Sequence, residues 1–214
     1  MQSTYHHFPN IGYLTAKFEE IDLLPIRMEI DDIQSNFDAY ESFTPNLAGH
    51  LTKEYELKES CSHIEQLVLP LIDQFDYSFD YLKKLNYLDH SLPWGIGRTW
   101  VNFQKKYEFN PVHSHTGVFS FVIYIKIPFK EDEENKVFIP MANGIKRNNS
   151  NFFFEYTNSL GHITMQDIPV YEDYENTIIF FPASMRHGVY PFYTSDEYRI
   201  SVAGNIELKT GLVK

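Results

Sequence analysis

Two histidines separated by one residue, His113 and His115, are the first candidates for chemistry in this sequence. Alternate side chains of a β-strand share a face, so both imidazoles are expected to point in the same direction. Two ring nitrogens on one face can bind one metal ion, and imidazole suits iron, zinc, copper and nickel. Surface loops also produce His-x-His by chance, so the pair alone is weak evidence for a metal site.

A third histidine, His187, follows a buried apolar run and a turn that contains Pro182. By itself, His187 could equally be a core histidine whose ring is satisfied by a backbone carbonyl. Further along, Arg199 and Ser201 share one face of an apolar β-run. A buried arginine without an anionic partner is costly, and the neighbouring strands offer no obvious acidic residue. A dicarboxylate ligand would supply that partner.

The elements that must position these residues change in character along the chain. Apolar residues at helical spacing predict helices over residues 21–37 and 61–85, and Pro70 should kink the second. From Trp100 onward, short β-runs alternate with turns, as in a sandwich or barrel. The expected strands cover residues 98–105, 118–127, 152–156, 163–166, 177–181, 188–192 and 198–208.

Size, charge and cysteine content limit the possible functions. We expect one domain over residues 1–214, because this length suits one substantial core. Cys61 is the only cysteine, so a metal must use histidine and oxygen ligands rather than a thiolate cluster. The net charge of −11 and the scattered arginines argue against nucleic acid. The charged run at 130–136 is expected on a solvated surface.

No apolar run of eighteen residues occurs, and the N-terminus lacks a signal-peptide pattern. We therefore expect a cytoplasmic protein that does not bind a membrane. Its oligomeric state is left open by the sequence.

Five motifs agree in order, spacing and strand context. They are Trp100-Val101-Asn102-Phe103, Phe109 through His115, Val122 through Pro128, Phe180-Phe181-Pro182 through Val189, and Arg199-Ile200-Ser201. Together they cover about half the chain and resemble the Fe(II)/2-oxoglutarate-dependent oxygenases, within them the prolyl-hydroxylase-like groups of bacteria and phages. The resemblance implies a mainly β fold, a double-stranded β-helix (jelly-roll, cupin-like) core over 98–208 with supporting helices from 1–97 packed on one sheet.

The resemblance also implies cofactors, site residues and a reaction. It assigns Fe(II) to three histidines: His113, His115 and His187. It assigns 2-oxoglutarate, through its distal carboxylate or neighbouring groups, to four polar residues: Arg199, Tyr124, Ser201 and Asn102. Of these, Asn102 could equally be a ladder asparagine without a role in the site. The enzyme would convert 2-oxoglutarate and dioxygen to succinate and carbon dioxide while hydroxylating an unidentified small molecule, amino acid or protein side chain.

His115 departs from the usual pattern of this family, which has Asp or Glu two residues after the first histidine. An imidazole in place of a carboxylate raises the net charge of the iron centre by one unit. His115 could be a third ligand, it could turn away and leave its position to water or an anion, or the site could be inactive. We favour the first explanation, because related bacterial and phage groups also carry His-x-His here.

Two other functions are compatible with the histidines. A three-histidine cupin enzyme would bind its substrate directly to the metal without 2-oxoglutarate, but cupins favour a glutamate soon after His-x-His, and none occurs between Thr116 and Lys130. A non-catalytic β-sandwich would use the histidines structurally and bind no metal. The substrate stays open, and its contacts are expected from loops near 44–50, 90–98 and 131–150.

Overall fold

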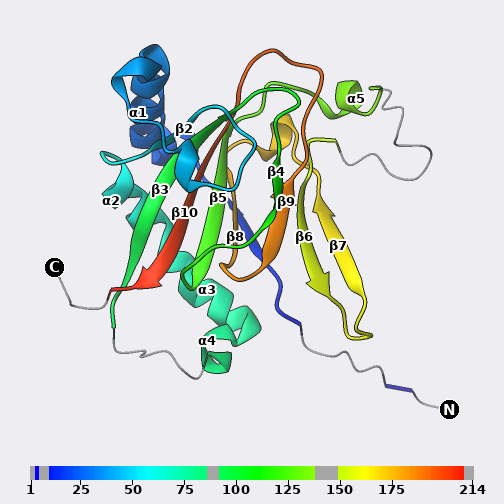
Figure 1. The fold of residues 1–214 in the computed structure, drawn as a ribbon. Helices are drawn as coiled ribbons and strands as arrows, with labels where there is room; N and C mark the ends of the chain where they lie inside the picture. The colour runs from blue at the N-terminus through cyan, green and yellow to red at the C-terminus, as the bar shows by residue number, and fades with distance from the viewer. Residues whose placement is uncertain (1–2, 5–9, 86–91, 138–148, 210–214) are drawn as a thin grey trace.

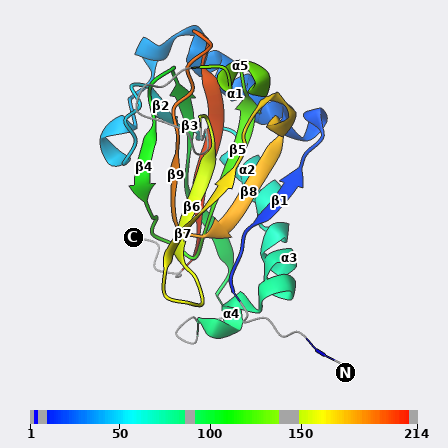
Figure 2. The ribbon, with the colours of Figure 1, turned by 90° about the vertical axis from the view of Figure 1, so that its right-hand side faces the viewer.

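Two antiparallel β-sheets face each other in the computed structural model, which describes residues 3–4, 10–85, 92–137 and 149–209 (Figure 1). Across the six-stranded sheet, the order is β1 (Leu14–Lys17), β8 (Thr177–Pro182), β5 (Phe119–Lys126), β10 (Arg199–Leu208), β3 (Trp94–Gln104) and β2 (Glu54–Glu56). Across the four-stranded sheet, it is β4 (Asn110–His113), β9 (Arg186–Val189), β6 (Phe152–Thr157) and β7 (Ile163–Ile168). Figure 2 shows the smaller sheet lying over the larger one. The predicted jelly-roll core is confirmed.

Helices from the first half of the chain cover the outer face of the six-stranded sheet (Figure 1). They are α1 (Leu24–Ser35), α2 (Cys61–Val68), α3 (Pro70–Phe79) and α4 (Tyr81–Lys84). The helix predicted over 61–85 is divided at Pro70, because proline lacks the N–H that would continue α2 but fits the first turn of α3. None of the described helices is long and apolar enough to cross a membrane.

Short helical segments complete the fold. They are α5 (Glu131–Glu134) and the 3₁₀ helices η1 (Glu20–Leu23), η2 (Phe37–Ala39), η3 (Thr44–Asn46) and η4 (Glu172–Tyr174). The 3₁₀ helix η1 runs directly into α1. Together they form the helix predicted over residues 21–37, which ends in the structure at Ser35.

The strand β5 shows how the two cores are divided. Its residues Phe121, Ile123 and Ile125 pack with the helices, whereas Val122 and Tyr124 lie in the second core between the sheets. Because both faces of the strand are buried, its sequence is continuously apolar instead of alternating. The second core is rich in phenylalanine and surrounds the region where the chemistry-bearing side chains meet.

Two short strands and several strand boundaries differ from the prediction, among them the start of β3 at Trp94 instead of residue 98. The sequence analysis predicts neither β2 nor β4, since three- or four-residue segments with polar side chains carry little periodicity and depend on their partners in the sheet. The strand predicted over 188–192 is instead β9, which ends before Pro191. Proline cannot donate to a ladder, and the earlier start places His187 inside the strand.

Candidate functional site

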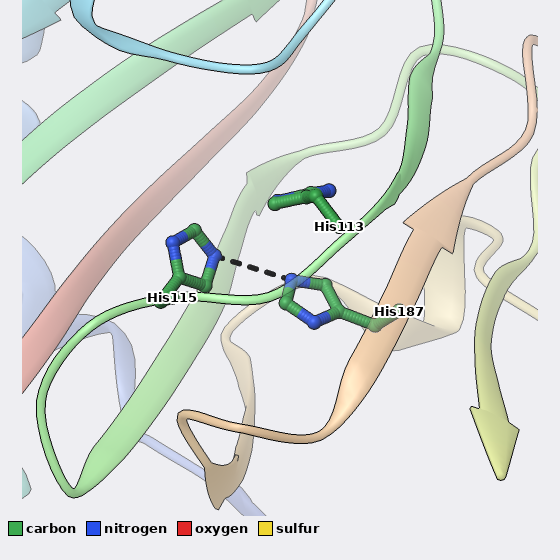
Figure 3. A group of neighbouring side chains, drawn as sticks. All are labelled: His113, His115 and His187. Atoms are coloured by element: carbon green, nitrogen blue, oxygen red, sulfur yellow. Dashed lines mark hydrogen bonds between the residues drawn. The ribbon is translucent and has the colours of Figure 1, made fainter.

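Three imidazoles meet between the two sheets (Figure 3). His113 ends β4 and is the direct register partner of His187 in β9. His115 lies just beyond β4, where its backbone N–H donates to the carbonyl of Ala183 at 2.9 Å. One ring nitrogen of each histidine lies within 4.8 Å of the others, and the Nε2 atoms of His115 and His187 are 3.2 Å apart. The structure thus brings together the three histidines that the sequence analysis singled out.

Backbone carbonyls fix the tautomers of two of these rings. The Nδ1 atom of His113 lies 2.7 Å from the carbonyl oxygen of Pro111, and Nδ1 of His187 lies 2.9 Å from that of Met185. A carbonyl oxygen only accepts, so each Nδ1 carries the proton and each Nε2 keeps a free lone pair. His187 can therefore be both a core histidine that is satisfied by a backbone carbonyl and a metal ligand, because the two roles use different ring nitrogens.

Burial keeps the three imidazoles neutral. Burial, with a smaller contribution from the neighbouring His113, lowers the pKa of His187 to about 3 and that of His115 to about 4. Burial also lowers the pKa of His113. Metals bind the unprotonated ring, and the hydrogen bond of 3.2 Å between the Nε2 atoms of His115 and His187 shows that these two nitrogens lie close enough to bind one ion in place of the shared proton. The cluster therefore fits a metal ion.

Aromatic rings enclose the histidine cluster. The Phe152 ring stacks on His187 with 5.4 Å between centroids, and the Phe181 ring meets the same imidazole at 4.7 Å. The Trp100 ring lies 5.8 Å from that of His115. These rings make the site apolar, which accounts for the lowered pKa values. Sequence analysis does not identify them, because aromatic residues in apolar strands are typical of any core.

A row of polar side chains crosses the six-stranded sheet beside the histidines. Ser201 of β10 pairs in register with Asn102 of β3 and with Tyr124 of β5, and Glu54 of β2 pairs with Asn102 on the other side. All four residues of this polar row line the pocket that contains the histidines. The Nδ2 of Asn102 donates to Ser201 Oγ at 3.2 Å, whereas Asn102 Oδ1 and the Tyr124 hydroxyl are buried without a partner. A polar ligand would satisfy these two groups.

Arg199 lies two residues before Ser201 on β10 and is 1% exposed. Its guanidinium donates to Gln104 Oε1 at 2.8 Å, to the Ser150 carbonyl at 2.7 Å and to the Tyr190 carbonyl at 3.1 Å. These acceptors are neutral, so they satisfy donors of the guanidinium without balancing its charge. Within the described part of the chain, no carboxylate forms an ion pair with Arg199, so its charge can attract an anionic ligand.

One residue of the charged run at 130–136 is buried, contrary to the expected solvated surface. Glu134 is 0% exposed, and its carboxylate accepts from the backbone N–H groups of Tyr193 and Thr194 and from the Thr194 hydroxyl. Burial lowers the pKa of Arg199 to about 10, and the charge of Glu134 opposes this shift. Glu134 therefore anchors the chain that leads into β10 and contributes to the charge balance around Arg199.

Glu54 is a pocket residue that the sequence analysis misses, because β2 is not predicted. Its side chain is 1% exposed and lines the same pocket as the histidines. Burial raises the pKa of Glu54 to about 7, with a smaller lowering by the Thr44 hydroxyl and a further rise from the charge of Glu108. A carboxylate in this state is costly to ionise.

Replacing Glu54 with glutamine is expected to stabilise the protein above neutral pH. The folded-state pKa of about 7 lies above the ordinary value of 4.5, so the stability that Glu54 contributes is fully present below pH 4.5 and is lost as the pH rises through 7. The shift corresponds to a loss on the order of 3 kcal/mol, which Glu54→Gln avoids. Urea unfolding of both proteins at pH 5 and pH 8 measures it. A stability difference that does not grow between these pH values would contradict the prediction.

Comparison with known proteins identifies the family of this chain. Residues 98–205 match the family described as "Putative 2OG-Fe(II) oxygenase". No curated protein matches the chain in sequence.

Solved structures with a similar fold include two prolyl hydroxylases. A prolyl-4-hydroxylase of Pseudomonas putida has a TM-score of 0.55 at 12% identity, and the match covers 92% of this chain and 93% of that one. A prolyl hydroxylase of Trichoplax adhaerens, in complex with a peptide fragment of the hypoxia inducible factor oxygen degradation domain, has a TM-score of 0.52 at 9% identity over 91% and 84% of the chains. AviO1 from Streptomyces viridochromogenes Tue57 has a TM-score of 0.51 at 10% identity over 94% and 90%. At these identities, the likeness shows a shared fold.

The family match spans half of the chain and includes every predicted site residue, from Asn102 to Ser201. It decides against the 2-oxoglutarate-independent cupin and the non-catalytic sandwich. The chain belongs to the 2OG-Fe(II) oxygenase family and is a dioxygenase that uses Fe(II) and 2-oxoglutarate.

Proposed function

We propose that His113, His115 and His187 bind the Fe(II) ion of this oxygenase. The observation that carries the proposal is the convergence of three neutral imidazoles, two of which have Nδ1 committed to a backbone carbonyl and Nε2 left as the free nitrogen. Three protein ligands leave positions on the metal for cosubstrate and dioxygen. When bound, the iron supplies the redox chemistry that activates dioxygen, and the aromatic walls keep the site dry.

We further propose that Arg199 and Tyr124 bind the distal carboxylate of 2-oxoglutarate. Arg199 contributes the positive charge, and the Tyr124 hydroxyl is a buried donor without a protein partner. Burial raises the pKa of Tyr124 to about 12 against the opposing effect of Arg199, so the hydroxyl keeps its proton at neutral pH. Asn102 and Ser201 are proposed as additional polar contacts, since both line the pocket and bond to each other.

The proposed reaction is the hydroxylation of a side chain on an amino acid, a small molecule or a protein. One oxygen atom of dioxygen enters the C–H bond of the substrate as a hydroxyl group, and the other enters the succinate that forms as 2-oxoglutarate loses carbon dioxide. The contribution of the chain is to orient both substrates and exclude water. The peptide bound to the Trichoplax adhaerens enzyme makes a protein side chain one reasonable candidate.

Thermal unfolding with Mn(II) as an inert substitute for Fe(II) tests the assembly of the site. Mn(II) should raise the midpoint of unfolding, and 2-oxoglutarate should raise it further only when Mn(II) is present, because binding to the folded state stabilises it. A midpoint that neither ligand changes would overturn the proposed function.

Alanine at position 115 is expected to lower the affinity for Mn(II) by at least about 10-fold. Removing a residue that only hydrogen-bonds to a metal ligand already costs about 10-fold in metal affinity, and removing a ligand itself should cost no less. Aspartate at the same position should restore most of the affinity, because a carboxylate is the usual ligand there. Titration calorimetry of His115→Ala and His115→Asp measures both, and His162→Ala, which removes an exposed imidazole outside the cluster, is the control. Wild-type affinity in His115→Ala would mean that His115 turns away from the metal.

A further inference from the structure

Three acceptor oxygens in the pocket have no hydrogen-bond donor. Glu54 Oε2, Asn102 Oδ1 and Asn110 Oδ1 are all buried without a partner, and all three residues line the pocket that contains the histidines. A buried polar atom without a partner is unfavourable, so such atoms indicate a missing ligand group. Amide oxygens and an ionised carboxylate accept hydrogen bonds, so a ligand group with N–H or O–H donors would satisfy them.

Gly49 brings the backbone of its loop close to two of these side chains. A Cβ atom built at Gly49 would lie 2.5 Å from Asn110 Oδ1 and 3.3 Å from Glu54 Oε1, so Glu54 and Asn110 border the same small region. Any side chain at this position would fill that region. Leu47 and Ala48 line the pocket beside it. The loop at 44–50, one of the three predicted to contact substrate, therefore borders the pocket, whereas parts of the other two loops lie outside the described residues.

Glu54 is separated from both other functional groups of the site. It lies on the edge strand β2, whereas Arg199 lies on β10, on the far side of β3. The group of metal-binding side chains found among the described residues contains the three histidines and not Glu54. An ionised Glu54 would repel the carboxylates of 2-oxoglutarate. The Glu54 region therefore suits a second ligand of opposite charge.

We propose that Glu54 and Asn110 bind a positively charged nitrogen group, an ammonium or a guanidinium, of the substrate that this enzyme oxidises. The inference rests on the proposed function and adds the chemical class of its substrate. An ammonium group offers three N–H donors and a guanidinium five, enough for the unpartnered oxygens. A cation also compensates the buried carboxylate, which a neutral donor does not. Burial, which raises the pKa of Glu54 to about 7, opposes ionisation until such a group is present.

Matched pairs of small ligands test the charge requirement. The protein loaded with Mn(II) and 2-oxoglutarate is titrated by calorimetry with N-acetyl-arginine amide against N-acetyl-citrulline amide, and with N-acetyl-lysine amide against N-acetyl-norleucine amide. We expect the cationic member of at least one pair to bind 10-fold or more tightly, as hydrogen bonds to charged groups are worth on the order of a 10- to 100-fold difference. Free lysine and arginine, and the same residues within glycine pentapeptides, distinguish an amino acid from a protein as the source.

Glu54→Gln should reduce the preference for the cationic ligand to less than about 3-fold, because it keeps the size of the side chain and removes its charge. Glu56→Gln is the matched control. Glu56 lies two residues along the same strand, outside the pocket, and its carboxylate is 3.6 Å from the Lys58 ammonium. This variant should keep the wild-type preference.

Several outcomes separate this inference from the proposed function. If the wild type is stabilised by Mn(II) and 2-oxoglutarate but binds cationic and neutral ligands equally, or binds none of them, the cation site is overturned and the proposed function stands. If Glu54→Gln retains the preference, or if it loses affinity for Mn(II), Glu54 does not bind the substrate cation and the inference is also overturned. A wild type that Mn(II) and 2-oxoglutarate fail to stabilise overturns the proposed function itself.

Discussion

Replacing His187 with alanine is expected to abolish metal binding and succinate formation. His187 is 4% exposed, and its Nε2 atom lies 3.2 Å from that of His115, so the variant removes one of three proposed ligands from the centre of the site. The loss of metal affinity should exceed about 100-fold, because removing residues that only hydrogen-bond to metal ligands costs up to about 100-fold. Metal content of the purified protein and succinate formed from 2-oxoglutarate are the measurements.

Loss of packing must be separated from loss of the ligand in this experiment. The His187 ring packs against Phe152 and Phe181, so alanine leaves a cavity that destabilises the core. His187→Leu keeps most of the volume and offers no ligand atom. Normal metal content in a folded His187→Leu protein would contradict the three-histidine site.

Changing Arg199 is expected to weaken 2-oxoglutarate binding far more than metal binding. Alanine would also leave Gln104, Ser150 and Tyr190 without their donor, and therefore destabilise the protein. Arg199→Lys keeps the charge and removes the planar fork of donors. We expect it to weaken 2-oxoglutarate about 10-fold, and Arg199→Ala about 100-fold, which corresponds to about 3 kcal/mol. Anaerobic titration with Mn(II) alone, and then with 2-oxoglutarate, separates the two affinities.

Tyr124→Phe is the matched variant for this prediction. The hydroxyl that it removes has no protein partner, so the folded state should be at least as stable as the wild type. The affinity for 2-oxoglutarate should still fall about 5-fold, as expected for one hydrogen bond of about 1 kcal/mol. If neither Tyr124→Phe nor Arg199→Lys changes this affinity, the cosubstrate lies elsewhere in the pocket.

The long buried strands of this fold could be predicted from the sequence alone. Strands β5 and β8 are almost continuously apolar because they are covered on one face by helices and on the other by the second sheet. The short strands β2 and β4 could not be predicted, because their few residues become strands only through pairing with β3 and β9. Local pattern therefore determines the centre of the large sheet, and tertiary pairing determines one edge strand of each sheet.

The residues of the candidate site could likewise be predicted in part from the sequence. Residue type, spacing and resemblance identify seven residues by sequence, and the structure places all of them in one pocket: His113, His115, His187, Arg199, Tyr124, Ser201 and Asn102.

What only the tertiary structure decides is which other groups surround these residues. The carbonyls that hold Arg199 belong to distant loops, and every residue has a carbonyl, so no sequence pattern marks them. Glu54 and Glu134 resemble surface glutamates in the sequence, and only folding buries them. The sequence by itself thus determined the iron and 2-oxoglutarate chemistry, while burial, which depends on the whole fold, decided that the Glu54 carboxyl faces the same pocket.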